Sequence, residues 1–169
     1  MVSSTPLKRN LARLMRLPLL RDLMLWGMKL TVPRQRIGVS MIALDEAERV
    51  FLLKHVFHPS IPWGLPGGWL GRNEAPAIGV LRELYEETGL TAVIGPVVHM
   101  ALEKNPTHIS IAYLAQIQPG DLTLSSEILE ARWFPIHSLP QPQYHFTEQA
   151  IRSAVQLRRL KNGQIEECS

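Results

Sequence analysis

Cysteine is almost missing from this chain, in which Cys168 is the single cysteine among 169 residues. One cysteine cannot form an internal disulfide, so packing and hydrogen bonds have to stabilise the fold. Its position so close to residue 169 also argues against thiol catalysis inside a folded domain. Because chains without disulfides are typical of reducing compartments, we expect a cytoplasmic protein.

Long uninterrupted apolar runs are missing as well. The apolar residues near the N-terminal end are interrupted by Arg21, Asp22 and Lys29, whereas a membrane span needs roughly 18 consecutive apolar residues. No apolar core of roughly 7–15 residues precedes a small-residue cleavage site, so a secretory signal is not expected. The chain also shows no internal repeat and no low-complexity tract.

What is present is the composition of an ordinary globular protein. Apolar residues make up 46% of the chain and charged residues 20%. These proportions exclude a disordered, collagen-like or disulfide-scaffold protein. A chain of 169 residues is long enough for one domain with a sizeable core and too short for two of ordinary size. We therefore expect one domain with appended segments.

Positive charge is concentrated in residues 1–36. This segment holds eight Lys and Arg residues against Asp22 alone, a net charge of +7, so the other 133 residues carry −4 within a chain of +3. Two short helices are expected here, one after Thr5-Pro6 and one after Leu17-Pro18, because proline is tolerated in a first helical turn. We interpret residues 1–36 as a basic amphipathic helical extension.

Three roles of this extension stay open. The second helix carries an apolar stripe made of Leu20, Leu23, Met24, Gly27 and Leu30. The stripe and the charge favour packing on acidic surface of the same domain or of a second copy, and we expect a homodimer. The same features suit a membrane surface, and the Arg-rich pattern is similar to an organelle presequence. Nucleic acid is not expected, since no aromatic residues are interleaved with the basic ones.

From residue 37 onward the pattern changes to strands and helices. Apolar, β-branched runs predict five strands, at residues 37–44, 50–57, 92–102, 109–117 and 131–134. The polar residues 45–49 predict a hairpin between the first two strands, and the Gly- and Pro-rich residues 58–69 predict a loop. A last helix is expected at about 146–160. Strands before, between and after helices predict an α/β fold with a mixed sheet.

The clearest helical pattern spans residues 75–88. Asn73 is placed to cap this helix, Pro76 stands in its first turn and Gly89 marks its end. At about 100° per residue, one face carries the side chains expected in the core. These are Ala77, Ile78, Leu81, Leu84, Tyr85 and Thr88.

Another face of the same helix gathers negative charge. Glu83, Glu86 and Glu87 lie within one turn, with Arg82 at the edge. Like charges at this spacing repel, so a bound cation is the natural reason to place them together. Carboxylate oxygens suit a hard divalent ion, and we expect Mg²⁺, with Mn²⁺ as the other choice. A solvated acidic face is the alternative that this helix alone leaves open.

The spacing around the helix carries more information. Five residues separate Gly68 from Glu74, seven separate Glu74 from Arg82, and then follows Arg-Glu-Leu-Tyr-Glu-Glu-Thr-Gly-Leu, ending at Leu90. From Gly68 to Leu90 this segment resembles the signature of the Nudix hydrolases at every specified position. The resemblance implies a Nudix-type α/β/α sandwich with a mixed β-sheet over residues 37–163, with residues 164–169 as a tail.

The resemblance also implies an activity. Nudix hydrolases cleave a diphosphate bond with metal-activated water. The substrate implied is a nucleoside diphosphate linked to another moiety, of the nucleotide, nucleotide-sugar or ADP-ribose type. By the same resemblance Glu86 and Glu87 are metal ligands, and Glu83 is a ligand or the general base. The backbone carbonyl of Gly67 is the further metal ligand that the resemblance implies.

Three more residues complete the catalytic set that we expect. Arg82 stands four residues before Glu86 and can hold that carboxylate in place, and Glu74 can brace the loop against the helix. Many Nudix enzymes use a further glutamate from a late loop, for which Glu127 and Glu130 are the candidates. We prefer Glu127, because the two serines before it predict a loop, whereas Glu130 adjoins a strand.

The substrate is less well indicated. Trp63, Phe57 and Tyr144 are the substrate-binding candidates, since aromatic rings stack on bases. No motif similar to those of the NADH, coenzyme A or diadenosine subfamilies is found. Two other functions stay open: a non-catalytic nucleotide-binding module, which the complete signature disfavours, and an RNA 5′-end pyrophosphohydrolase. An isomerase on this fold would need a cysteine inside the domain, and Cys168 is badly placed for it.

Overall fold

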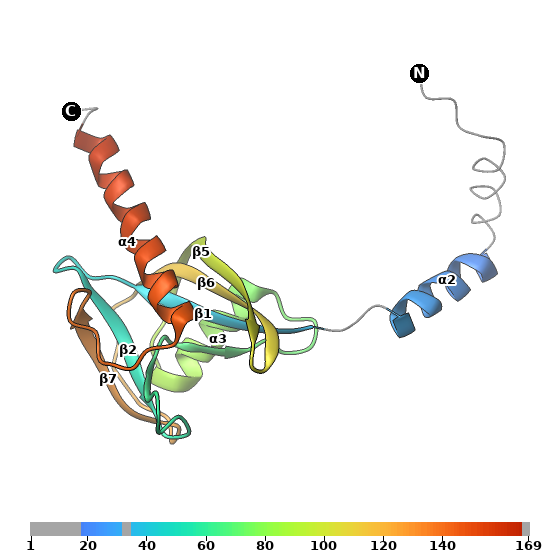
Figure 1. Ribbon diagram of the computed structural model, residues 1–169, viewed down its shortest axis with the longest axis horizontal. Coiled ribbons are helices and arrows are strands. Elements are labelled where there is room, and N and C mark those ends of the chain that lie inside the picture. The colour runs from blue at the N-terminus through green and yellow to red at the C-terminus, as the bar shows by residue number, and fades with distance from the viewer. Residues whose placement is uncertain (1–17, 32–34, 167–169) are drawn as a thin grey trace. The chain divides into compact units, whose positions relative to one another are not determined.

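The computed structural model describes residues 18–31 and 35–166 (Figure 1). The chain divides into two compact units between residues 34 and 35. The first unit contains helix α2 (Pro18–Thr31), which is the second helix expected in the extension. The helix expected after Thr5-Pro6 lies outside the described residues. Within the described ranges, no helix combines the length and the apolar character that crossing a membrane requires.

The second unit is an α/β fold built on two sheets. Its elements are β1 (Arg36–Ala43), β2 (Arg49–His55), β3 (Trp63–Gly64), β4 (Gly67–Trp69), α3 (Pro76–Thr88), β5 (Ala92–Lys104), β6 (Thr107–Ile117), β7 (Ile128–Pro135) and α4 (His145–Glu166). One sheet has the order β4-β1-β6-β5, the other β3-β2-β7. Because β1 runs parallel to β6 and antiparallel to β4, the first sheet is mixed, as predicted.

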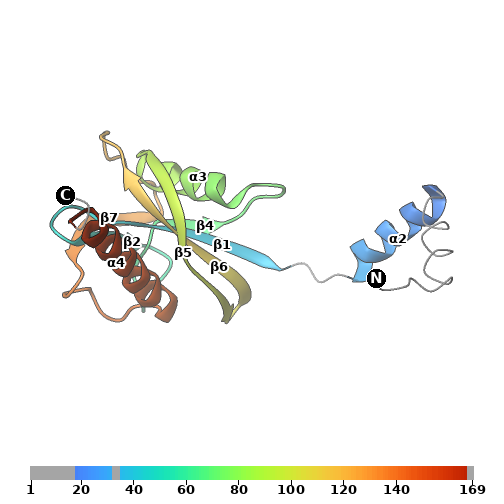
Figure 2. The ribbon, with the colours of Figure 1, turned by 90° about the horizontal axis from the view of Figure 1, so that it is seen from above.

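Two helices cover opposite faces of the mixed sheet. Along β1, Val39 and Met41 face one side and pack with Val80 of α3, while Ile42 faces the other side and packs with Ala150 of α4. This alternation is the period of two that a strand buried on both faces requires. Figure 2 shows α3 and α4 on either side of the sheet. The expected α/β/α layering is therefore confirmed.

The hairpin predicted around residues 45–49 is wrong in one respect. The turn itself closes, since the Asp45 N–H donates to the Arg49 carbonyl at 3.0 Å and Leu44 forms a bridge with Val50. Beyond it the strands separate, because β1 pairs with β4 and β6 whereas β2 pairs with β3 and β7. Residues 50–53 of β2 are all buried. A strand buried on both faces belongs in the middle of its own sheet.

The segment predicted as a loop at residues 58–69 contains two short strands. β4 places Gly68 opposite Val39 and Gly67 opposite Ser40 of β1. Gly67 has φ +151°, and a Cβ on it would collide with the backbone of Val39. Glycine is therefore required at the point where this segment crosses the edge of β1.

The start of α3 also differs from the prediction, while its end does not. Ala75 is the N-cap and makes no side-chain cap hydrogen bond, so the predicted cap at Asn73 is wrong. Pro76 follows directly and has no N–H that needs a partner. At the other end Gly89, with φ +70°, donates its N–H to the Tyr85 carbonyl at 2.8 Å. The predicted glycine stop is confirmed.

The last helix is longer than predicted. α4 runs from His145 to Glu166, so the tail expected at residues 164–169 is helical through Glu166. The apolar residues of this helix continue the core only as far as Val155. The helix continues beyond its last core residue. A prediction from the apolar pattern therefore ended the helix too early, near residue 160.

Candidate active site

Arg82 of α3 joins three carboxylates. Its Nη1 lies 2.8 Å from Oε1 of Glu83 and 2.8 Å from Oε2 of Glu86. Its Nε and Nη2 donate to the two oxygens of Glu74 at 2.8 and 3.0 Å, and Nη2 also donates to the Trp69 carbonyl at 3.1 Å. The planar fork of guanidinium donors suits such an arrangement. One side chain thus ties the helix to the loop before it.

Glu74 accepts three hydrogen bonds. Besides the two bonds from Arg82, its Oε2 accepts the N–H of Gly71 at 2.7 Å. The Arg82 guanidinium and then the Gly71 N–H lower the pKa of Glu74 to about 2. The carboxylate is therefore ionised at any ordinary pH and closes the turn between β4 and α3.

Glu87 stands in a different environment, buried between α3 and β4. One of its oxygens, Oε2, accepts the Gly67 N–H at 3.0 Å. Burial raises the pKa of Glu87 to about 8, and the charges of Glu83, Glu127 and Glu86 act in the same direction. Burial also raises the pKa of Glu83. The hydrogen-bond donors around Glu83 and Glu87 therefore do not offset the effect of burial and neighbouring negative charge on these two carboxylates.

The segment after β6 is tied to the C-terminal end of α3. The N–H of Thr123 donates to the Thr88 carbonyl at 2.9 Å, and the N–H of Ser125 donates to the Glu87 carbonyl at 3.0 Å. Two residues further, the Glu127 carbonyl accepts the Val56 N–H at 2.9 Å. These bonds hold Glu127 close enough to Glu87 for its charge to raise the pKa of Glu87.

A cavity of about 260 Å³ opens beside Gly67 and Gly68. Two pairs of rings line it: Trp69 packs on His108 with ring centroids 4.7 Å apart, and Tyr144 packs on His58 at 6.3 Å. Among the described residues that line it, none is Lys or Arg. The cavity therefore suits an uncharged, flat group better than a second anionic one.

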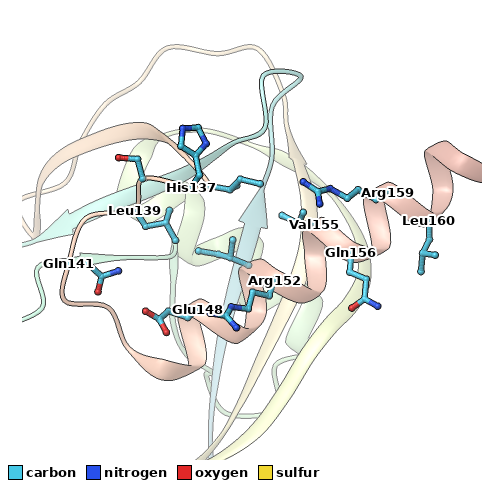
Figure 3. A pocket seen from close by; sticks show the side chains of 12 residues that line it. His137, Leu139, Gln141, Glu148, Arg152, Val155, Gln156, Arg159 and Leu160 are labelled. Atoms are coloured by element: carbon cyan, nitrogen blue, oxygen red, sulfur yellow. The ribbon is translucent and has the colours of Figure 1, made fainter.

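A larger cavity of about 820 Å³ lies elsewhere, between α4 and the segment after β7 (Figure 3). Figure 3 shows Glu148, Arg152 and Arg159 reaching into it from α4, opposite His137 and Leu139. No carboxylate of α3 lines this cavity. The smaller cavity adjoins the cluster of Glu83, Glu86 and Glu87, because its lining residue Gly67 donates its N–H to Glu87 and its lining residue Gly68 lies against Glu83. The cluster and the smaller cavity are therefore the candidate active site.

A comparison with protein families finds a match for most of the chain. The model of the NUDIX domain matches residues 34–154. The chain belongs to the Nudix family. Its Nudix signature, Gly68 to Leu90, forms β4, the following loop and α3, so the signature residues are the ones that Arg82 and Gly67 bring together.

Relatives of known name are similar over most of this Nudix domain. An ADP-ribose pyrophosphatase of Methanocaldococcus jannaschii is 27% identical over 125 residues, which is 71% of this chain and 72% of the relative. A MutT-like protein of Streptomyces ambofaciens is 29% identical over 103 residues, 60% of this chain and 64% of that relative. Family and relatives support a pyrophosphohydrolase that acts on phosphorus-containing anhydrides.

The fold is also found in solved structures. The crystal structure of an ADP-ribose pyrophosphatase from Streptococcus suis superposes with a TM-score of 0.64 at 22% identity, covering 75% of this chain and 93% of that one. A UDP-X diphosphatase gives a TM-score of 0.65 at 19% identity, covering 82% and 71% of the two chains. These likenesses establish the Nudix fold of the second unit.

Nudix enzymes generally use a divalent metal ion, and the carboxylates here suit one chemically. In the described residues no three His, Cys, Asp or Glu side chains are already arranged to hold a metal. Arg82 contacts one oxygen each of Glu83 and Glu86. The donors are nevertheless all hard oxygens, which Mg²⁺ and Mn²⁺ prefer. Burial raises the pKa values of Glu83 and Glu87, and neighbouring carboxylates act in the same direction, so a bound cation would stabilise the charged forms of these groups.

The three predicted substrate-binding aromatics lie in different places. Tyr144 lines the cavity at the active site. Trp63 does not: its ring packs edge-on against Phe134 at 4.7 Å, beside the core. Phe57 is 69% exposed and does not line the cavity either. Only Tyr144 of the three is therefore placed to meet a substrate in this cavity, and its role stays a prediction.

His108 and Ser110 also line the cavity and were not singled out by the sequence. His55 lies with Nδ1 3.9 Å from Oε1 of Glu87, and burial followed by the neighbouring His58 lowers the pKa of His55 to about 4, so this contact is between a neutral ring and the carboxyl group. Behind Trp69, Ser110 Oγ lies 2.9 Å from Nε2 of His108. Isolated histidines and serines carry no sequence signal, because strand pairing alone brings them to the cavity.

Replacing Gly68 by alanine is expected to disturb the site directly. A Cβ at this position would stand 2.6 Å from the carboxyl carbon of Glu83, so the carboxylate has to move away from Arg82. We expect a loss of turnover of roughly 10²-fold, since small misplacements of catalytic groups cost about this much. Gly120→Ala is the matched control, because a Cβ there makes only an ordinary 3.5 Å contact with Leu90. Equal turnover in the two variants would contradict the prediction.

Proposed function

We propose that this protein is a Mg²⁺-dependent pyrophosphohydrolase that cleaves the diphosphate bond of a nucleoside diphosphate linked to another moiety. One observation carries the proposal. Glu87 of α3 accepts the Gly67 N–H and Glu83 lies against Gly68, and these two glycines line a cavity that also carries aromatic rings and has no Lys or Arg among its described lining residues. A substrate with phosphates at one end and a neutral, flat group at the other fits that division of charge.

The side chains of the carboxylate cluster and Arg82 have different roles. Glu83, Glu86 and Glu87 are the groups that would hold Mg²⁺, together with the backbone of Gly67. When bound, the metal would neutralise the diphosphate and lower the pKa of the attacking water. Arg82 keeps the carboxylates in position through the contacts at 2.8 Å, and Glu74 holds Arg82 in turn. Such positioning of charged groups supplies much of the rate of phosphoryl transfer.

A proton has to leave the attacking water. Glu127 is the group we assign to this step, because its segment is fastened to α3 and its charge acts on Glu87. The oxygen of the water then forms a bond to one phosphorus, and the bridging oxygen leaves with the other. Two phosphate-containing products result, one of them a nucleoside monophosphate when the substrate is ADP-ribose.

ADP-ribose is the first substrate to test. A relative that shares 71% of this chain's length is named ADP-ribose pyrophosphatase. The cavity also favours a compound with a neutral group beyond the diphosphate, since no Lys or Arg is found among its described lining residues to pair with a further phosphate. A nucleoside triphosphate or an RNA 5′ end carries that further charge and is expected to be a poorer substrate.

The test is product release from a panel of substrates with Mg²⁺ or with a chelator. ADP-ribose, UDP-glucose, ATP and 5′-triphosphorylated RNA are incubated with the protein, and nucleoside monophosphate, pyrophosphate and phosphate are measured. We expect Mg²⁺-dependent release of nucleoside monophosphate, reduced by roughly 10²–10³-fold in Glu86→Gln, as for other lost charge-stabilising groups.

Other outcomes would point elsewhere. Pyrophosphate released mainly from the triphosphates or the RNA would replace the proposed substrate class with one that carries more phosphates. No release from any compound, together with nucleotide binding that Glu86→Gln leaves intact, would favour the non-catalytic module. Equal turnover of wild type and Glu86→Gln at limiting Mg²⁺ would remove the carboxylate cluster from the mechanism.

A further inference from the structure

Helix α2 exposes large apolar side chains along one side. Leu19 is 81% exposed, Leu23 61% and Trp26 63%. These residues are four and three positions apart, the spacing that places side chains on one face of a helix. Single exposed leucines are common on protein surfaces, but two leucines and a tryptophan in a row form a continuous stripe. A stripe of this kind marks a surface that binds something apolar.

The length of α2 restricts how its apolar face can bind an apolar partner. Its 14 residues correspond to about 21 Å of helix, shorter than the ~30 Å core of a bilayer. Arg21 and Lys29 also stand inside the helix. Long basic side chains of this kind can extend their charged ends to the water while their stems stay in apolar surroundings. A helix with these features lies along a membrane surface rather than across it.

The net charge of residues 1–36 indicates which partner this apolar face binds. Residues 1–36 carry a net charge of +7. Two copies that met through α2 would bring two such segments together, and their charges would repel. The headgroups of anionic phospholipids attract the same charges, and each Lys or Arg near such a surface strengthens binding several-fold. Charge complementarity therefore favours an anionic bilayer over a contact between the α2 helices of two copies.

Trp26 fits this assignment. Its ring is amphipathic, with an apolar body and one N–H donor, and tryptophan is enriched where a membrane meets water. We propose that α2 binds the protein to the surface of anionic lipid bilayers, with Leu19, Leu23 and Trp26 among the acyl chains and the net positive charge of residues 1–36 attracting the protein to the headgroups. This surface belongs to the first unit of the chain and is independent of the hydrolase activity of the second.

The test is co-sedimentation of the full chain with vesicles. Vesicles of phosphatidylglycerol and phosphatidylcholine are compared with vesicles of phosphatidylcholine alone, at low and at high salt. Leu23→Glu is the diagnostic variant, and Leu160→Glu is its matched control. Both leucines stand in helices and are exposed to the same degree, 61% and 60%. The same substitution thus tests position rather than exposure.

We expect the wild type and Leu160→Glu to sediment with the anionic vesicles and to be largely released by high salt. Leu23→Glu should bind at least tenfold more weakly, and neutral vesicles should bind all three proteins weakly. Hydrolase activity and melting temperature, measured on the same samples, should be alike in the three proteins. Failure of the wild type to bind anionic vesicles, or equal loss in both variants, would overturn the proposal.

Light scattering on the same proteins tests whether a second copy of the chain covers this face instead of a bilayer. If the wild type were twice the monomer mass and Leu23→Glu were a monomer, the stripe would be covered by a second copy, and the lipid proposal would be wrong. An unchanged mass in both, combined with vesicle binding lost only in Leu23→Glu, would support it.

Discussion

Replacing Glu87 by glutamine is expected to make the metal-free protein more stable while removing most of its activity. The carboxylate is buried, and its pKa of about 8 means that ionising it opposes folding at pH 8 and above. Glutamine keeps an oxygen that can accept the Gly67 N–H and removes the charge. We expect the free energy of unfolding in a chelator to rise by about 1–3 kcal/mol, as when other buried charges are neutralised, and turnover to fall roughly 10³-fold.

The pH dependence gives this prediction a definite sign. A glutamate titrates near 4.5 when unfolded, so between about pH 4.5 and 8 the native protein binds a proton at Glu87 that the unfolded chain has lost. The wild type therefore loses stability as the pH rises through this range, and the variant does not. Denaturant unfolding in a chelator at pH 5 and pH 8 measures the difference.

Added Mg²⁺ should reverse the order of the two proteins. A ligand that binds only the native state stabilises it in proportion to its saturation, and the wild type has the complete carboxylate set. If Mg²⁺ stabilised Glu87→Gln as strongly as the wild type, Glu87 would not be a metal ligand. If the variant were less stable at pH 8 without metal, the buried charge would be compensated in some other way.

The fold was predictable where local sequence decides it. Pro76 and Gly89 bracket α3 because each suits one end of a helix for reasons internal to its own residue. The division into two sheets was not predictable in this way. A turn of polar residues closes after Leu44 whether or not the flanking strands stay paired, and their partners come from strands far along the chain.

The same distinction applies to the site. The contact of Arg82 with Glu86 follows from their spacing of four residues on a helix, and the structure has it. The contact of Arg82 with the adjacent Glu83 does not follow from that spacing. The cavity depends on residues that strand pairing and ring packing bring together. His108 reaches Trp69 across β1, and Trp63 turns toward Phe134 instead of the cavity. An aromatic residue in a sequence shows that a ring is present but not which neighbour it meets.

The second large effect concerns the late glutamates. Glu127→Gln is expected to lower turnover at saturating substrate and Mg²⁺ by roughly 10²–10⁴-fold, the range for removing a general base. Stability should change little, because Glu127 is exposed and the bond from Val56 goes to its backbone carbonyl. Turnover and melting temperature of the purified variant are the measurements.

Glu130→Gln is the control that makes this result specific. Glu130 stands three residues later on β7, opposite Lys54 of β2, and forms an ion pair with Arg132. An exposed pair of this kind contributes only about 0–1 kcal/mol to stability, so the variant should be nearly as active and as stable as the wild type. Should Glu130→Gln lose more turnover than Glu127→Gln, the proton would be taken from the β7 side, and the assignment of Glu127 would be wrong.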